Sequence, residues 1–211
     1  MLNEIRNYLD FAGLQYRNPD KAGEEREKML ELRHKGQEAR KAFTELAKAF
    51  QASHPEWQLQ QTSQWMNQAQ RLRPHFWVYL QRDGQVTEPM LALRLYGNPS
   101  DFGISLEVSF IERKKDEQTL GKQAKVLEIP AVEGIYYLVY YNGQSQRWEA
   151  NEENRQILIE KMGSQEIRKV LVKADVPVTA NLSEEEIVEG LLKSYAKILP
   201  YYLATRKLDN P

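Results

Sequence analysis

The chain has 211 residues, of which 29 are basic, 30 are acidic and none is cysteine, and its formal net charge is −1. The lack of cysteine excludes disulfides, thiolate zinc sites, iron–sulfur clusters and cysteine nucleophiles, and the balanced charge differs from the strongly basic profile typical of nucleic-acid-binding domains. The first residues do not resemble a signal peptide, and no run approaches the ~20 apolar residues of a membrane span. We therefore expect a cytoplasmic protein with no membrane partner.

The N-terminal quarter predicts two helices, a short one over residues 3–12 and a long one over 21–52. In the long helix, apolar residues recur at alternating spacings of three and four, which gives one continuous apolar stripe. The stripe residues are Met29, Leu32, Gly36, Ala39, Phe43, Leu46 and Phe50. We expect this stripe to pack inside the chain, and the alternative is that the long helix binds a second copy or another protein partner.

The middle of the chain changes to the period of two that is typical of strands. This pattern predicts an antiparallel meander followed by a hairpin, with a weaker strand signal over 57–66. The predicted strands are 76–80, 90–96, 104–111, 135–141, 144–149 and 167–176. Asn142-Gly143 separates two of them, and this dipeptide favours the type I′ turn of a two-residue hairpin. Helices are predicted between strands, over 116–128 and 152–162.

The C-terminal segment predicts one more helix. Ser183 and Glu186 form a capping box ahead of apolar residues at helical spacing, and Pro200 is expected to end or kink the helix. Together these elements predict an α+β fold, in which a mostly antiparallel sheet of about five to seven strands packs against a long N-terminal helix and a C-terminal helix. We expect a single domain over 1–211, and its segments are helical over 1–55, mainly β with two helices over 56–180, and the C-terminal helix over 181–211.

The sequence carries no complete catalytic motif. The glycines do not form G-x-G-x-x-G or a Walker loop, and the histidines lack the paired spacing of metal ligands. Gly103-Ile104-Ser105-Leu106-Glu107 begins like a nucleophile elbow but lacks the second glycine. We therefore expect no cofactor, no metal site and no catalytic residue, and we lean against an enzyme. An enzyme would need a dispersed site, for example Glu107, His75 and a tyrosine in a closed pocket with a perturbed carboxylate pKa.

Aromatic and basic residues alternate along the first predicted strands. Rings that share a face with guanidinium groups can stack on bases and pair with phosphates. The candidate nucleic-acid- or ligand-binding residues are Arg71, Arg73, His75, Trp77, Tyr79, Arg94, Tyr96, Arg113 and Lys114. The alternative is that the rings fill the interface between sheet and helices, with the arginines at its edge.

Part of this pattern resembles a known family of DNA-binding domains. The residues concerned are Ser63-x-Trp65, Arg73-Pro74-His75-Phe76-Trp77-Val78-Tyr79-Leu80, Met90–Tyr96, Gly103-Ile104-Ser105-Leu106-Glu107 and Leu199-Pro200-Tyr201-Tyr202. Over about half of the chain they are similar to the N-terminal domain of McrBC-type, modification-dependent restriction systems. The resemblance implies that a modified base, flipped from the duplex, enters an aromatic pocket, which would give Trp65, Trp77, Tyr79 and Tyr96 a role.

The chain also departs from that family. The 211 residues include no AAA+ motor, Asn67-Gln68-Ala69-Gln70 stands where the family has a glycine-rich stretch, and the long charged N-terminal helix has no counterpart. Three functions are therefore open. The first is a non-catalytic binding or adaptor protein, which predicts an exposed apolar patch. The second is a nucleic-acid-binding module that uses an aromatic and basic groove over 71–82 with Arg113-Lys114-Lys115, and the third is an enzyme with a dispersed site.

Overall fold

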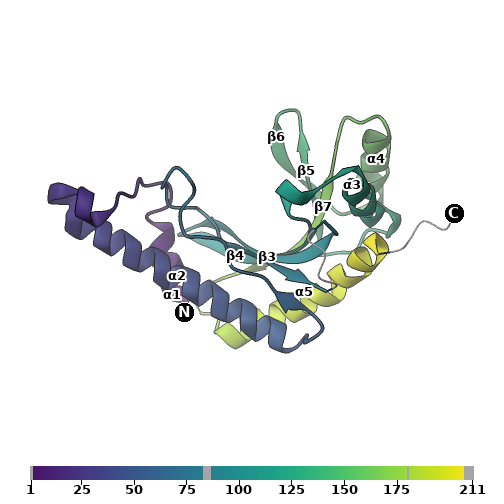
Figure 1. Cartoon of the computed structure of the whole chain (residues 1–211). Coiled ribbons are helices and arrows are strands. Elements are labelled where there is room, and N and C mark those ends of the chain that lie inside the picture. Colours follow the sequence, from purple (N-terminus) through teal and green to yellow (C-terminus); the bar gives the residue numbers. More distant parts are fainter. Residues whose placement is uncertain (1, 83–86, 180, 207–211) are drawn as a thin grey trace. The chain divides into compact units, whose positions relative to one another are not determined.

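The computed structural model describes residues 2–82, 87–179 and 181–206, and it confirms the predicted α+β fold (Figure 1). Its helices are α1 (Leu2–Leu9), α2 (Arg26–Ala52), α3 (Glu117–Ala124), α4 (Glu152–Gly163) and α5 (Glu184–Thr205). Its strands are β1 (Gln58–Leu59), β2 (Trp77–Gln81), β3 (Met90–Asn98), β4 (Asp101–Ser109), β5 (Tyr136–Tyr141), β6 (Gln144–Glu149) and β7 (Val170–Pro177). The strands form a 7-stranded antiparallel sheet in the order β1-β2-β3-β4-β7-β5-β6.

The chain divides into two compact units. Unit 1 comprises Met1–Tyr79, Leu93–Ile104 and Pro177–Glu189, and unit 2 comprises Leu80–Ala92, Ser105–Val176 and Gly190–Pro211. Several strands and α5 contribute residues to both units. The predicted single domain over 1–211 stays a prediction. Among the helices of the described residues, none combines the length and the apolar character that crossing a bilayer requires.

The long helix α2 begins later than the sequence predicts. Residues 19–25 form two short 3-10 turns, and the regular helix starts only at Arg26. The physical reason is Gly23, whose φ of +56° lies in the left-handed region and interrupts the helical path. From there the whole predicted apolar stripe of α2 is buried, which confirms that it packs inside the chain.

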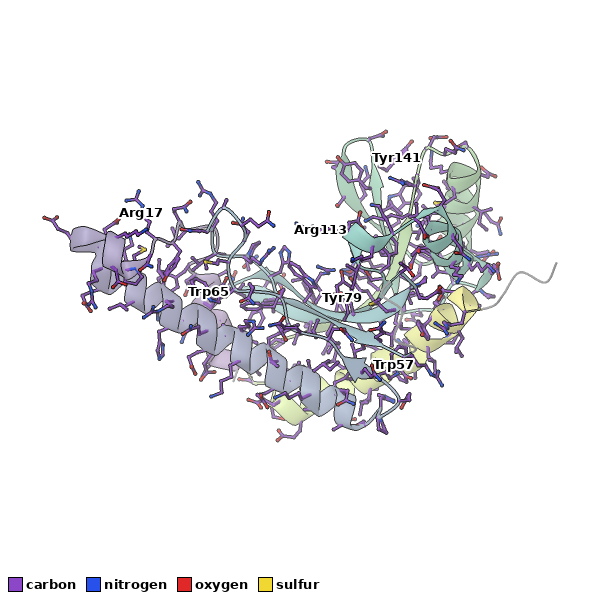
Figure 2. The ribbon with its side chains drawn as sticks, viewed as in Figure 1. Arg17, Trp57, Trp65, Tyr79, Arg113 and Tyr141 are labelled. Carbon is purple, nitrogen blue, oxygen red and sulfur yellow. The ribbon has the colours of Figure 1, made fainter. Side chains whose placement is uncertain are left out.

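Trp65 lies directly on α2 at Gly36 (Figure 2). A Cβ atom at Gly36 would come within 2.6 Å of Cε3 of the Trp65 ring, so only glycine allows this approach. Tyr16 meets the same ring edge-on, with the centroids 5.0 Å apart. Gly36 therefore occurs inside the helix because a tryptophan occupies the space that another side chain would fill.

The core of unit 1 joins the start of the sheet to α1 and α2. Phe76, just before β2, stacks on Tyr8 of α1 with the ring centroids 5.1 Å apart, and it lies 5.9 Å from Phe43 of α2. All three rings are fully buried. Figure 1 shows α1 and α2 next to each other in this unit. Even-numbered positions near β2 therefore face the helices.

Unit 2 contains the predicted hairpin. Tyr141 pairs with Gln144, and Asn142 and Gly143 have φ values of 51° and 78°, as a type I′ turn requires. β5 pairs on its other side with β7. The buried side chain of Gln123, from α3, donates to the carbonyls of Val108 and Val170 at 3.1 and 2.9 Å, so this helix is hydrogen-bonded to β4 and β7.

Local interactions explain where β4 and α5 begin. β4 begins at Asp101 instead of residue 104, because the Asn98 side chain accepts from the backbone N–H groups of Ser100 and Asp101 and closes a tight turn. In α5 the capping box is confirmed, since Ser183 and Glu186 bond reciprocally. Pro200 does not end this helix, which continues to Thr205.

The contact at Gly36 gives a prediction about stability. We expect Gly36→Ala to lower the free energy of unfolding by about 1–3 kcal/mol, because the new methyl group collides with Trp65 and outweighs the gain in helix propensity. Gly121→Ala in α3 is the matched control, because a Cβ there meets nothing within 4 Å. It should leave stability unchanged or raise it by up to ~1 kcal/mol. Urea denaturation checks both, and equal stabilisation by the two substitutions would contradict the packing described.

Candidate functional site

Three of the predicted site residues gather around the ring of a fourth, Trp77, in unit 1. The guanidinium carbon of Arg73 lies 4.7 Å from the centroid of the Trp77 ring, and that of Arg94 lies 5.5 Å from it. The His75 ring is tilted against the same indole, with the centroids 5.7 Å apart. Both arginines are within the ~6 Å at which a cation is attracted to an aromatic face. We call Arg73, His75, Trp77 and Arg94 the Trp77 cluster.

Along β2 and β3, the cluster lies on the face opposite the fully buried residues. Phe76 and Val78 are fully buried, whereas Trp77 and Tyr79 between and after them are half-buried. Because successive side chains of a strand point to opposite faces, Trp77 and Tyr79 point away from the helices that cover Phe76. In Figure 2, Tyr79 is labelled on the strands, and α2 runs below them.

β3 repeats this division. Leu93 and Leu95 are fully buried, whereas Arg94 and Tyr96 are half-buried. For Trp77, Tyr79 and Tyr96, this half-burial favours an accessible face over the alternative in which the rings fill the interface between sheet and helices. These alternating residues form a half-buried aromatic and basic face.

Hydrogen bonds from α2 and its neighbouring loop hold Trp77 in place. The backbone N–H of Trp77 donates to Oγ of Ser63 at 3.1 Å, and the Ser63 N–H donates to the Trp77 carbonyl at 2.9 Å. Arg40 of α2 in turn donates to the carbonyls of Thr62 and Ser63 at 2.9 and 3.0 Å. The start of β2 is thus fixed to α2 through the loop that precedes it.

Tyr8 fixes the segment that carries Arg73. Its hydroxyl lies 2.5 Å from the carbonyl oxygen of Trp65 and 2.8 Å from that of Arg73. Burial raises the pKa of Tyr8 well above its ordinary value, so the hydroxyl stays protonated and remains a donor. Nε of Arg73 donates to the Met66 carbonyl at 3.2 Å, which orients the guanidinium plane beside Trp77.

The remaining predicted residues are not part of this cluster. Arg71 is exposed and donates to the Gly13 carbonyl at 3.2 Å. Arg113 and Lys114 belong to unit 2, where they are exposed on a short 3-10 helix over Glu112–Lys114. Trp65, to which the family resemblance gives a base-binding role, is buried against α2 instead.

Unit 2 contains a polar network that the sequence did not reveal. Nζ of Lys173 on β7 lies 2.8 Å from Oε2 of Glu107 on β4, and these side chains are 5% and 0% exposed. Tyr136 on β5 is the register partner of Lys173, and its hydroxyl donates to Oδ1 of Asp175 at 3.0 Å. Burial, together with the negative charge of Asp175, raises the pKa of Tyr136 well above its ordinary value.

Arg147 on β6 completes this network. It donates to Oδ2 of Asp175 at 2.7 Å, and its guanidinium carbon lies 3.7 Å above the ring of Tyr136. Glu107 is thus compensated by a buried lysine, whereas His75, its predicted companion in a dispersed catalytic site, belongs to unit 1. One sequence signal could have pointed to this network. Lys173 and Asp175 occupy alternate positions of an otherwise apolar strand, which places two charges on one face.

Comparison with known proteins identified no family for this chain. No protein-family model matches the chain, and a search of curated proteins found no significant match. The resemblance to the McrBC-type domain therefore stays a prediction, and the function has to be argued from the residues themselves.

The buried pair of Glu107 and Lys173 gives a prediction. Glu107→Gln should lower the free energy of unfolding by about 3–5 kcal/mol, because it leaves the Lys173 ammonium buried without a counter-charge. The double variant Glu107→Gln with Lys173→Met should lose much less than the sum of the two single losses, because no buried charge remains. Denaturation of the four proteins forms a double-mutant cycle. Additive losses would show that the two groups do not depend on each other.

Proposed function

We propose that this chain is a non-catalytic binding protein and that its ligand is single-stranded nucleic acid, held on the face that carries the Trp77 cluster. The observation that supports this most is the pair of guanidinium groups, Arg73 and Arg94, placed within 6 Å of one half-buried indole. Such a group presents a ring for a base and two positive charges for the phosphates beside it.

The geometry favours single strands over duplexes. Trp77, Tyr79 and Tyr96 are half-buried on strands of one sheet, and a sheet with aromatic side chains on its open face is a stacking platform for unpaired bases. In a duplex the base faces are already stacked, and reaching them requires a nucleotide to flip out at a cost of a few kcal/mol. The net charge of −1 means that the affinity comes from this local group of residues, not from the charge of the whole chain.

The alternative, an adaptor that binds a protein through α2, has less support. Its apolar stripe is buried within the chain. Among the described residues, the large apolar side chains with the most exposure are Leu14, Val132, Tyr140, Ile159 and Leu203, and none of them lies on α2. A protein partner or a homodimer through this helix would have to use its charged face and stays a prediction. The proposal places the protein in the cytoplasm, where single-stranded RNA is abundant.

Fluorescence polarisation of a labelled thymidine 12-mer tests the proposal. We expect binding that weakens about sevenfold between ~50 and ~200 mM salt if Arg73 and Arg94 each contact one phosphate. Trp77→Ala should weaken binding by about 5- to 150-fold, the range that corresponds to the loss of one stacked base. Arg94→Ala should also weaken binding and should remove about half of the salt dependence.

Two matched controls make this test specific. Trp148→Ala removes a half-buried indole from β6 of unit 2, and Arg26→Ala removes an exposed guanidinium from the first turn of α2. Neither should change the affinity. An affinity that is lost equally in the controls, or no binding at ~50 mM salt, would contradict the proposal. Tighter binding to the matching duplex would contradict the preference for single strands.

A further inference from the structure

Unit 2 contains a cavity of about 460 Å³ that the Trp77 cluster does not involve. Its floor includes Leu138 of β5 and Leu171 of β7, which are register partners on adjacent strands. Both leucines are only half-buried, although they lie in the middle of the sheet's strands. Tyr140, two residues along the same face as Leu138, lines the mouth and is 59% exposed. The volume falls in the range of sites for small organic ligands, which are mainly apolar with a few placed polar groups.

Among the polar residues that line this cavity is a carboxylate, Glu112, held between two lysines. Nζ of Lys115 lies 2.5 Å from Oε1 of Glu112, and Nζ of Lys169 lies 2.8 Å from Oε2. Although burial raises the pKa of Glu112, hydrogen bonds from Lys115 and Lys169 lower it below its ordinary value overall, so the carboxylate is ionised. Two ammonium groups thus face a single negative charge, and each of them gives only one of its three N–H donors to Glu112.

The other charged residues at the rim do not cancel this excess. The carboxylate of Glu166 accepts from Nζ of Lys161 at 2.8 Å and from the Ser164 hydroxyl at 2.9 Å. Nη2 of Arg168 lies 3.1 Å from Oε1 of Glu117, and both of these side chains are largely exposed. One positive charge therefore remains at Lys115 and Lys169, next to the apolar floor. A ligand with one negative charge matches that excess, whereas a polyanion would need more cations than the rim provides.

We infer that this cavity binds a small organic monoanion. Its apolar body lies on Leu138 and Leu171 beside the ring of Tyr140, and its carboxylate or sulfonate takes the remaining N–H donors of Lys115 and Lys169. Glu112 then acts as a built-in competitor, because it occupies the same lysines in the empty cavity and repels the incoming anion. This inference does not depend on nucleic-acid binding, since every residue that it uses belongs to unit 2.

The probe for this site is anilinonaphthalene sulfonate, which combines an apolar body with one negative charge and fluoresces when it is buried. N-phenyl-1-naphthylamine has the same body without the charge. We expect saturable binding of one sulfonate probe per chain. Lys169→Gln should weaken the sulfonate about tenfold, as for the loss of one charge-assisted hydrogen bond, and should change the affinity of the neutral probe less than about twofold.

The decisive variant is Glu112→Gln, because it should have the opposite effect. Removing the competing carboxylate should tighten sulfonate binding several-fold without changing the neutral probe, and damage to the fold would not produce this result. Lys41→Gln, an equal change of charge at an exposed position of α2, should have no effect. Circular dichroism melts confirm that each variant is folded. The inference is overturned if Glu112→Gln and Lys169→Gln bind the sulfonate like the wild type, or if several probes bind per chain.

Discussion

The buried hydroxyl of Tyr8 connects parts of the chain on which the rest of unit 1 depends. It reaches the backbone of Trp65 and of Arg73, two points that the sequence separates from it by more than fifty residues. At the first of these points, the indole ring of Trp65 packs against Gly36 of α2. At the second, Arg73 lies beside Trp77 just before β2 begins. One hydrogen-bonding group thus holds both the packing of the long helix and the geometry of the candidate site.

The alternation of side chains along β2 and β3 separates the residues of the core from those of the proposed binding face. One face consists of buried residues that pack in the core, such as Val78 and Leu95. The other face presents Trp77, Tyr79 and Arg94 half-buried, and it can exchange contacts with a ligand without disturbing the core. The proposed binding needs no net positive charge on the chain, because Arg73 and Arg94 both lie beside the Trp77 ring.

Sequence patterns predicted the features that arise from neighbouring residues. The apolar stripe of α2, the Asn142-Gly143 turn and the capping box at Ser183 are all local, and all are present. Strand alternation also placed Trp77 and Tyr79 on one face, although it could not say whether that face was the core. The predicted start of α2 was wrong, because the positive φ of Gly23 interrupts the helical path before Arg26.

Other features depend on contacts between distant residues, which no periodicity encodes. Arg40 bonding to the Ser63 loop, Lys173 facing Glu107, and Lys169 bonding to Glu112 each join separate elements. Trp65 shows the limit most clearly. The family resemblance implied a base-binding ring at this position, but the contact with Gly36 of α2 places the ring in the core.

The most direct measurement is a nuclear magnetic resonance titration of the four tryptophan indole N–H signals with a thymidine oligonucleotide. Single Trp→Phe variants assign the signals. The account predicts that the Trp77 signal shifts progressively to saturation, while those of the buried Trp57 and Trp65 and of Trp148 in unit 2 do not move. A Trp77 signal that stays in place while the oligonucleotide binds, or that moves no more than the other three, would contradict the assignment of this face as the nucleic-acid site.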